Sequence, residues 1–313
     1  MKKFIYILAA FACTGCVSDD REDYTPDLRL MFEPQMYMHV SHADVDCFSL
    51  DENFVVGGWK LPAGAASWES GKPLAVEHLQ PSEASSREVF ITIPHTGEIL
   101  ADTLWMVSDA TQWPATDECL AFMAYSPSDA DCSCTKEDGI TYSVDALQNQ
   151  TDLLYTDPRV DRRESDNGYV VQLNFKHALC RINFRVKHRV AADEQIAIKR
   201  ITIDDVRHKG TFRSLHTPQW SLQEQVTPLD FFEGNQVAEP LPEPIGRYWM
   251  VVPQALDTQV TVEYEYTTFA NTSLTNRLQT VPLRTKLESG LSYTYTLSVG
   301  IDDVKFLQEI IQD

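Results

Sequence analysis

The stretch "VVQLNFKHALCRINFRV", residues 170–186, decides how the fold is interpreted. Most odd positions are apolar from Val171 to Leu179, and even positions are apolar from Ala178 to Val186. Because successive side chains of a strand point to opposite faces, the buried face changes sides within this stretch. Two explanations are open at this point: the strand passes from one β-sandwich to another, or it holds a bulge or is covered on both faces within one domain.

Alternation with a period of two residues dominates the rest of the chain beyond residue 27. It is clearest in QVTVEYEYT (259–267) and SYTYTLSV (292–299), where apolar and polar residues alternate. This pattern predicts antiparallel sheets with one face toward solvent, and therefore an all-β fold. The best helical pattern is at the end of the chain, in residues 303–313. Further predicted strands are 28–32, 36–40, 88–94, 103–108, 119–126, 195–204 and 247–253.

The predicted architecture is two antiparallel β-sandwich domains in tandem. A charged loop near residues 150–170 divides the chain into halves of about 140 residues, a common domain size. The proline-rich segment 237–246 is interpreted as a long loop inside the second domain, with a true domain linker as the alternative. The predicted parts are residues 1–15 as a signal peptide, 16–27 as an acidic tether, 28–165 as the first sandwich and 166–313 as the second.

The first residues have the order of a secretory signal: two lysines, a short apolar run and small residues. The small residue before Cys16 resembles the lipobox of bacterial lipoproteins, which implies a diacylated Cys16 at the mature N-terminus. An ordinary signal peptide is the alternative, since Cys13 stands where lipoboxes usually carry Leu or Val. The acidic residues that follow resemble the export signal of surface lipoproteins in Bacteroidia, which implies a cell-surface location at the outer membrane.

The charge of the chain argues against a nucleic-acid partner. Removal of residues 1–15 takes away Lys2 and Lys3 but no acid, which leaves 24 basic against 46 acidic residues and a formal charge of −22. A field of this sign repels phosphate backbones and anionic lipid. No later segment reaches the length of apolar sequence that crosses a membrane as a helix, so the lipid is the expected anchor.

The sequence nominates no catalytic residue, metal site or cofactor. The motifs G-x-S-x-G, H-E-x-x-H and G-x-G-x-x-G are absent. The five cysteines beyond Cys16 are an odd number without the spacing of a disulfide framework or a zinc site. His177 is interpreted as a buried, hydrogen-bonded imidazole. Four tryptophans are candidates for stacking on sugar rings, although core positions are the commoner role: Trp59, Trp68, Trp113 and Trp220.

Five sequence anchors, in order, resemble the fimbrillin-like proteins of Bacteroidia. The resemblance implies two transthyretin-like β-sandwiches and a role as a subunit of type V pili, with other pilus subunits as partners. It implies export to the outer membrane as a lipoprotein, proteolytic removal of the N-terminal strand, and filling of the groove by a strand of the next subunit. The anchors are Trp113-Pro114, LAFMAYSP (120–127), GITY (139–142), DLLY (152–155) and LNFKHAL (173–179).

Strand exchange would involve both ends of the mature chain, because a sheet that lacks one strand is completed only by another strand. The family pattern is matched in part: no arginine lies between Arg29 and Arg87 for an arginine-specific protease, and the C-terminal end carries no tryptophan. Both departures leave room for an anchor or accessory subunit. The removable strand would contain Leu28, Leu30 and Phe32, and the donated tail Val304, Phe306, Ile310 and Ile311.

Two other functions are weighed against the non-catalytic pilus subunit. A surface glycan-binding lipoprotein would use Trp59 or Trp113 as its platform. A secreted hydrolase is disfavoured because no constellation of catalytic groups is evident.

Overall fold

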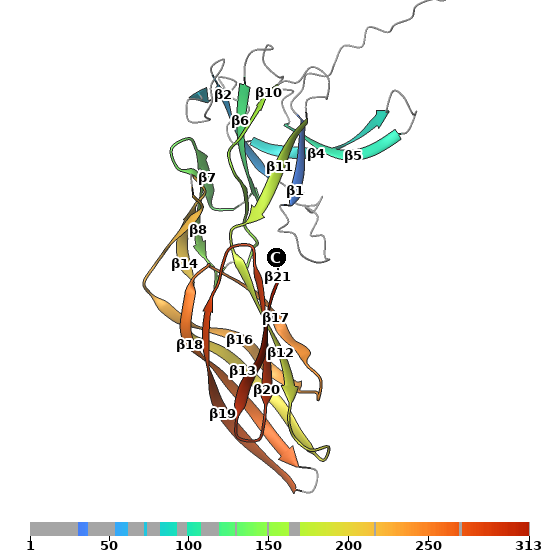
Figure 1. Cartoon of the computed structure of the whole chain (residues 1–313), viewed down its shortest axis with the longest axis vertical. Helices are drawn as coiled ribbons and strands as arrows, with labels where there is room; N and C mark the ends of the chain where they lie inside the picture. The colour runs from blue at the N-terminus through green and yellow to red at the C-terminus, as the bar shows by residue number, and fades with distance from the viewer. Residues whose placement is uncertain are drawn as a thin grey trace, which may run out of the picture.

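The structure is a computed structural model, and it describes the chain from residue 31 to residue 312 with gaps. Every helix or strand in this part is a β-strand, which confirms the predicted all-β class. No helix in these residues is long and apolar enough to span a membrane. Figure 1 shows the strands along an elongated molecule. The described residues are 31–36, 54–61, 72–73, 82–92, 99–107, 119–128, 130–148, 150–162, 170–215, 217–268 and 271–312.

The first sheet has nine strands, and an additional pairing of β6 with β2 closes its order into a ring. Aromatic residues fill its interior: the rings of Phe32 and Phe122 lie 5.3 Å apart, edge to face, and those of Phe54 and Phe175 lie 5.5 Å apart. The strands, in spatial order, are β10 (Arg159–Arg162), β6 (Cys119–Ser126), β9 (Leu154–Thr156), β11 (Val170–His177), β1 (Met31–Met36), β5 (Ile99–Val107), β4 (Ser82–Thr92), β2 (Val55–Leu61) and β3 (Lys72–Pro73).

Two four-stranded sheets of the C-terminal part pack face to face around one apolar core. Alternate residues enter this core from Cys180 to Val186 and from Val260 to Tyr264, as the period-two pattern predicted. Phe184 of one sheet contacts Phe231 of the other, with ring centroids 4.7 Å apart. The first sheet is β17 (Glu243–Val251), β12 (Cys180–His188), β20 (Ser292–Val299) and β21 (Val304–Gln312). The second is β16 (Val226–Val237), β13 (Glu194–Arg207), β18 (Ala255–Thr268) and β19 (Asn271–Lys286).

A smaller sheet combines strands from both sides of the predicted domain boundary. Its order is β15 (Gln219–Leu222), β14 (Lys209–Arg213), β8 (Gly139–Asp145) and β7 (Cys132–Thr135). Phe212 of β14 is fully buried, and its ring lies 4.7 Å from that of Tyr155. The division at residues 165/166 stays a prediction, and strand pairing crosses it here and again where β11 joins the nine-stranded sheet.

The stretch 170–186 forms two strands in two different sheets. β11 buries Val171, Leu173 and Phe175 in the nine-stranded sheet, and β12 buries even-numbered residues in the core of the C-terminal sheets. Ala178 and Leu179 lie between the two strands and are buried. The change of phase in the sequence therefore marks the passage of the chain from one sheet to another.

Residues 303–313, which hold the best helical pattern of the sequence, do not form a helix, because residues 304–312 form strand β21. An isolated helix of this length is marginal in water, whereas β21 pairs with β20 along the whole of that strand. The interpretation of 237–246 as a loop agrees in part with the structure: β16 ends at Val237 and β17 begins at Glu243.

Candidate functional site

The first candidate site is strand β1, which lies between β11 and β5 in the nine-stranded sheet. All six residues of β1 pair with β11 in parallel, whereas only Met31 and Phe32 pair with β5. Proline has no N–H to donate to a ladder, and Pro34 follows the point where the pairing with β5 ends. β1 is therefore fully paired on one side and only partly paired on the other.

Phe32 is the side chain through which β1 enters the core. Its exposed fraction is 0%, and it packs edge to face against Phe122. Full burial of a phenylalanine side chain contributes about 1.5–3 kcal/mol to stability. Loss of β1 would expose this pocket together with the backbone of β11. Leu28 and Leu30, the other residues predicted for a removable strand, lie outside the described residues, as does Cys16.

The second candidate site is strand β21, at the edge of its sheet. It pairs with β20 in antiparallel fashion, with one register shift. Val304 is buried, and the ring of Phe306 lies 5.7 Å from that of Tyr295. Ile310 is half-buried and pairs with Thr294, while the backbone of Ile311 pairs with Tyr293. All four residues predicted for a donated tail therefore belong to one edge strand.

A turn held by charged side chains connects β20 to β21. The Gly300 amide donates to the Asp303 carbonyl at 2.7 Å, and Arg189 Nη2 lies 2.5 Å from the Asp303 carboxylate. Burial raises the pKa of Asp303, but hydrogen bonds from Lys305 and Arg189 outweigh it, so the pKa lies below its usual range. The start of β21 is thus tied to the end of β12.

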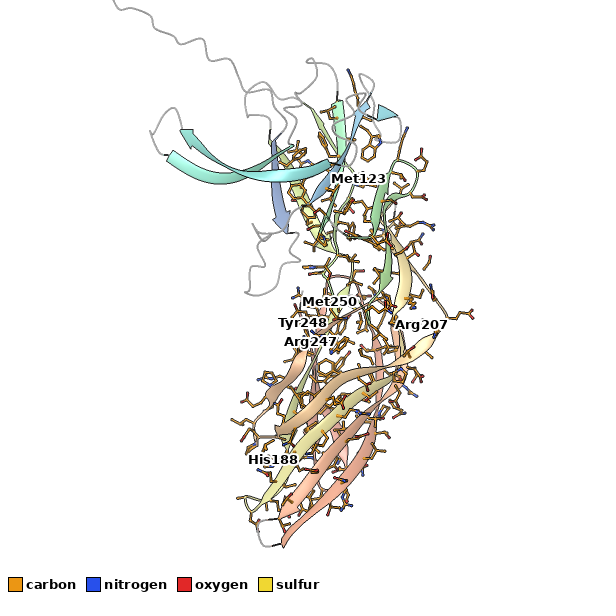
Figure 2. The ribbon with its side chains drawn as sticks, turned by 180° about the vertical axis from the view of Figure 1, so that it is seen from behind. Met123, His188, Arg207, Arg247, Tyr248 and Met250 are labelled. Carbon is orange, nitrogen blue, oxygen red and sulfur yellow. The ribbon has the colours of Figure 1, made fainter. Side chains whose placement is uncertain are left out.

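Residues 145–153 tie β8 and β9 to the C-terminal sheets. Asp145 Oδ1 lies 2.8 Å from His208 Nδ1, and Asp152 Oδ2 lies 2.8 Å from His177 Nδ1. The Gln150 side chain accepts from the amide of Met250 at 2.8 Å and donates to its carbonyl at 3.1 Å. Figure 2 shows Met250 near the middle of the molecule. His177 is thus hydrogen-bonded, as predicted, but to a carboxylate and not to backbone.

Groups with catalytic or metal-binding chemistry do not gather in the described residues. No group of three or more His, Cys, Asp or Glu side chains there has the arrangement of a metal site. Burial raises the pKa of Cys134 to about 12, so its thiol is protonated at neutral pH. Trp59 is 5% exposed, so it has the core position that is the commoner role of such tryptophans and is not available as a sugar platform. Trp220 donates its indole N–H to the Ala178 carbonyl, while Trp68 and Trp113 lie outside the described residues.

A family model described as fimbrillin-like matches residues 63–312, which is most of the chain. The chain belongs to the fimbrillin-like family. The match includes β21 and all the C-terminal sheets, and it begins after β1. No curated protein matches the chain by sequence.

Solved structures with a TM-score above 0.5 share the fold of this fimbrillin-like chain at low sequence identity. A candidate cell adhesion protein from Bacteroides ovatus has 15% identity and a TM-score of 0.54, with 91% of this chain and 97% of that chain covered. Another from Bacteroides uniformis has 13% identity and a TM-score of 0.52, with 91% and 98% covered. The fimbrial anchor protein Mfa2 from Porphyromonas gingivalis is aligned over 90% of this chain at 9% identity, with a TM-score of 0.38.

Sequence reasoning missed the pairing of β1 with β11. These strands are more than 130 residues apart in the sequence, and the pairing is parallel. Parallel neighbouring strands are not joined by a hairpin, so no turn motif in the sequence indicates that they pair. The one available signal is Pro34, which indicates a position where the ladder is incomplete on one side.

Proposed function

We propose that this fimbrillin-like chain is a non-catalytic structural or accessory subunit of a surface pilus, assembled by β-strand exchange after lipoprotein export. Its partners would be other pilus subunits, in a homopolymer or a heteropolymer. Membership in the fimbrillin-like family supports a pilus or adhesin type of subunit. Tandem transthyretin-like sandwiches at 28–165 and 166–313 belong to the same proposal.

The observation that carries the proposal is that β1 and β21 occupy different positions in their sheets. β1 lies inside a sheet, so its removal would leave an acceptor groove with a pocket at the position of Phe32. β21 lies at a sheet edge and pairs only with β20 among the described strands, so it can leave without breaking another described pairing. A groove and a detachable strand on one chain are what head-to-tail strand exchange requires.

The N-terminal part of the proposal concerns export and anchoring. Cys16 would carry the lipid that holds the precursor to the outer membrane, and residues 16–27 would tether the first sandwich. Processing would release the subunit for polymerisation. A retained lipid would instead make it the anchor of the pilus.

Substitution on β21 tests strand exchange in cells. Phe306→Asp places a charge where the donated strand packs, whereas Leu307→Asp changes a side chain that is 53% exposed. On unboiled gels we expect wild type and Leu307→Asp to form a ladder of heat-sensitive multimers and Phe306→Asp to lose it. A single monomer band for all three proteins, boiled or not, contradicts strand exchange.

The N-terminus of the surface protein tests processing. Mass spectrometry of the N-terminal peptide distinguishes a start at Cys16, which indicates a retained lipid, from a start downstream of β1, which indicates a processed subunit. A start at Met1 would refute export as a lipoprotein.

A further inference from the structure

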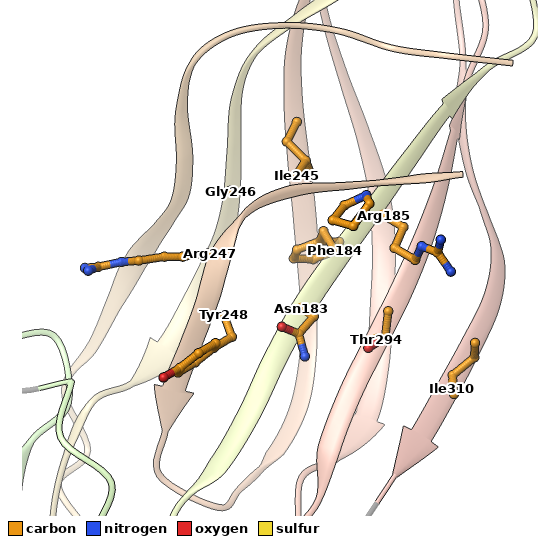
Figure 3. Close-up of a pocket in the computed structure, with 10 residues that line it drawn as sticks. Asn183, Phe184, Arg185, Ile245, Gly246, Arg247, Tyr248, Thr294 and Ile310 are labelled. Carbon is orange, nitrogen blue, oxygen red and sulfur yellow. The ribbon is translucent and has the colours of Figure 1, made fainter. Parts of the chain in front are cut away.

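The outer face of the β17-β12-β20-β21 sheet contains a hollow beside an irregular part of β17. Ile182 pairs with Trp249 and Phe184 with Ile245, so residues 246–248 of β17 lie opposite Asn183 alone. Such a bulge bends the strand away from its partner. Gly246 has φ 68°, a conformation that favours glycine. The hollow has a volume of about 270 Å³ (Figure 3).

Four side chains form a row across this face, one from each strand. Asn183 pairs with Thr294, and Thr294 pairs with Ile310, so these three lie side by side on the outer face. Tyr248 lies on the β17 side of Asn183 (Figure 3). Neighbouring strands are about 4.8 Å apart, so the row is roughly 14 Å long. An aromatic ring and an aliphatic side chain thus border a polar floor.

The groups of the row are held in place by their neighbours. Tyr248 is 51% exposed, and Arg181 lies over its ring at 5.1 Å. Arg181 is itself fixed by Asp152 at 3.1 Å. The amide nitrogen of Asn183 donates to the Ser292 hydroxyl at 3.1 Å, which directs its carbonyl oxygen elsewhere. Fixed groups lose little conformational entropy on binding.

Positive charge is available beside the row. Arg185 lines the hollow, and its Nη2 donates to the Pro242 carbonyl at 2.9 Å, which orients the guanidinium without neutralising it. Lys187 is two residues further along β12 and so on the same face. Within the described part of the chain, neither side chain has a carboxylate partner. Arg247 also lines the hollow, and its guanidinium lies over the Trp249 ring at 5.1 Å (Figure 3).

We propose that this hollow binds a sugar that carries a carboxylate, such as a terminal sialic or uronic acid of a glycan. The Tyr248 ring offers a face for stacking, Asn183 and Thr294 offer hydrogen bonds to hydroxyl groups, and Arg185 offers a charge-assisted bond to the carboxylate. An acidic peptide fits less well, because the row runs across the face of the sheet and not along a free backbone edge. Ile310 belongs to β21, the strand proposed for donation, whereas the groups that would bind the sugar lie on β17, β12 and β20.

Calorimetric titration of the purified full chain with sialyllactose and digalacturonate, against lactose and neutral digalactose, tests the proposal. We expect saturable binding of the acidic sugars only. Arg185→Gln and Tyr248→Ala should each weaken it at least tenfold, as loss of a charge-assisted bond or a stacked ring does. The matched controls are Arg284→Gln and Leu278→Ala, exposed positions on β19 of the other sheet, and they should leave binding unchanged.

Three outcomes overturn the proposal. Equal binding of acidic and neutral sugars refutes the role of Arg185. An equal loss in Arg284→Gln shows that only the general charge of the chain matters. Stronger binding of a hexaglutamate peptide than of either acidic sugar assigns the hollow to a peptide. Thermal melts of each variant verify the fold, and Tyr248 is exposed enough for its replacement to be tolerated.

Discussion

Tyr142 places a hydroxyl group inside the apolar core between β8 and the nine-stranded sheet. This hydroxyl donates to the Leu154 carbonyl at 2.7 Å, and the Ser126 carbonyl lies 3.2 Å from it. Burial raises the pKa of Tyr142 well above its usual value, so the phenol stays neutral. The group therefore fixes the position of β8 against the short strand β9.

Removal of this hydroxyl should destabilise the protein. In Tyr142→Phe the Leu154 carbonyl loses its hydroxyl donor inside the core, so we expect the free energy of unfolding to fall by about 1–2 kcal/mol. Urea unfolding followed by circular dichroism measures the change. Tyr248→Phe is the control, because its hydroxyl is at an exposed position, and a loss of equal size there would contradict the argument.

The pair Asp145–His208 predicts a dependence of stability on pH. Burial raises the pKa of Asp145, but hydrogen bonds from His208 and Lys209 outweigh it and hold the pKa below the ordinary 3.8. A carboxyl group whose pKa is lower in the folded state contributes stability above its unfolded pKa and loses it as the pH falls through the folded pKa.

The expected result is an acid-sensitive joint between β8 and β14. Between pH 5 and pH 3 the melting temperature of the wild type should fall more steeply than that of Asp145→Asn, because the variant lacks the titrating carboxyl group at position 145. Asp257→Asn, on an exposed part of β18, serves as the control and should follow the wild type. Parallel curves for wild type and Asp145→Asn would disprove the contribution.

At the scale of elements, the sequence predicts strands well where apolar and polar residues alternate regularly. It predicts them less well where pairing with a neighbouring strand decides the conformation. The period-two runs at 259–267 and 292–299 lie in β18 and β20, because their apolar residues have one core to enter. Residues 303–313 contain apolar residues at both spacings, and the neighbouring edge of β20 selects the strand. The bulge of β17 depends on the register with β12, which no local pattern encodes.

Gly246 makes the bulge of β17 possible, so its replacement should destabilise the protein. An alanine at φ 68° costs about 1–2 kcal/mol, and its Cβ would lie 3.3 Å from the Phe231 ring. We expect Gly246→Ala to lower the free energy of unfolding by that amount. Gly246→Asn should cost less, since asparagine adopts this conformation more readily. Equal losses in the two variants would indicate that contact with Phe231, and not backbone conformation, dominates.

At the scale of the whole molecule, the all-β class follows from the sequence. The passage of the chain near residue 178 is one of two explanations that the sequence leaves open, and the mixed sheet is not predicted. The pattern of residues 170–186 contains the passage because burial changes face there. The pairing of β14 with β8 joins residues more than 60 positions apart, and both strands are polar on one face like many others. For the candidate site, the assignment of Phe32 and of the four tail residues to exchangeable strands stays a prediction, and no signal in the sequence indicates the hollow beside Gly246.

The mixed sheet predicts that the C-terminal half is incomplete alone. In a fragment of residues 166–313, β14 lacks β8, and Phe212 lacks its contact with Tyr155. We expect hydrogen exchange to be fast at 209–222 in the fragment and slow in the full chain, while β13 stays protected in both. Equal protection of 209–222 in both proteins would mean that this hairpin folds without β8.

Ala178 and Leu179 are the only residues between β11 and β12, and both are buried. The Ala178 amide donates to the Leu153 carbonyl at 2.8 Å, and its carbonyl accepts from Trp220 at 2.9 Å. A bend at this point would have to break those hydrogen bonds and expose both side chains to water. Under a pulling force the two ends should thus move as one stiff rod, and the first yielding should occur elsewhere than at this crossing.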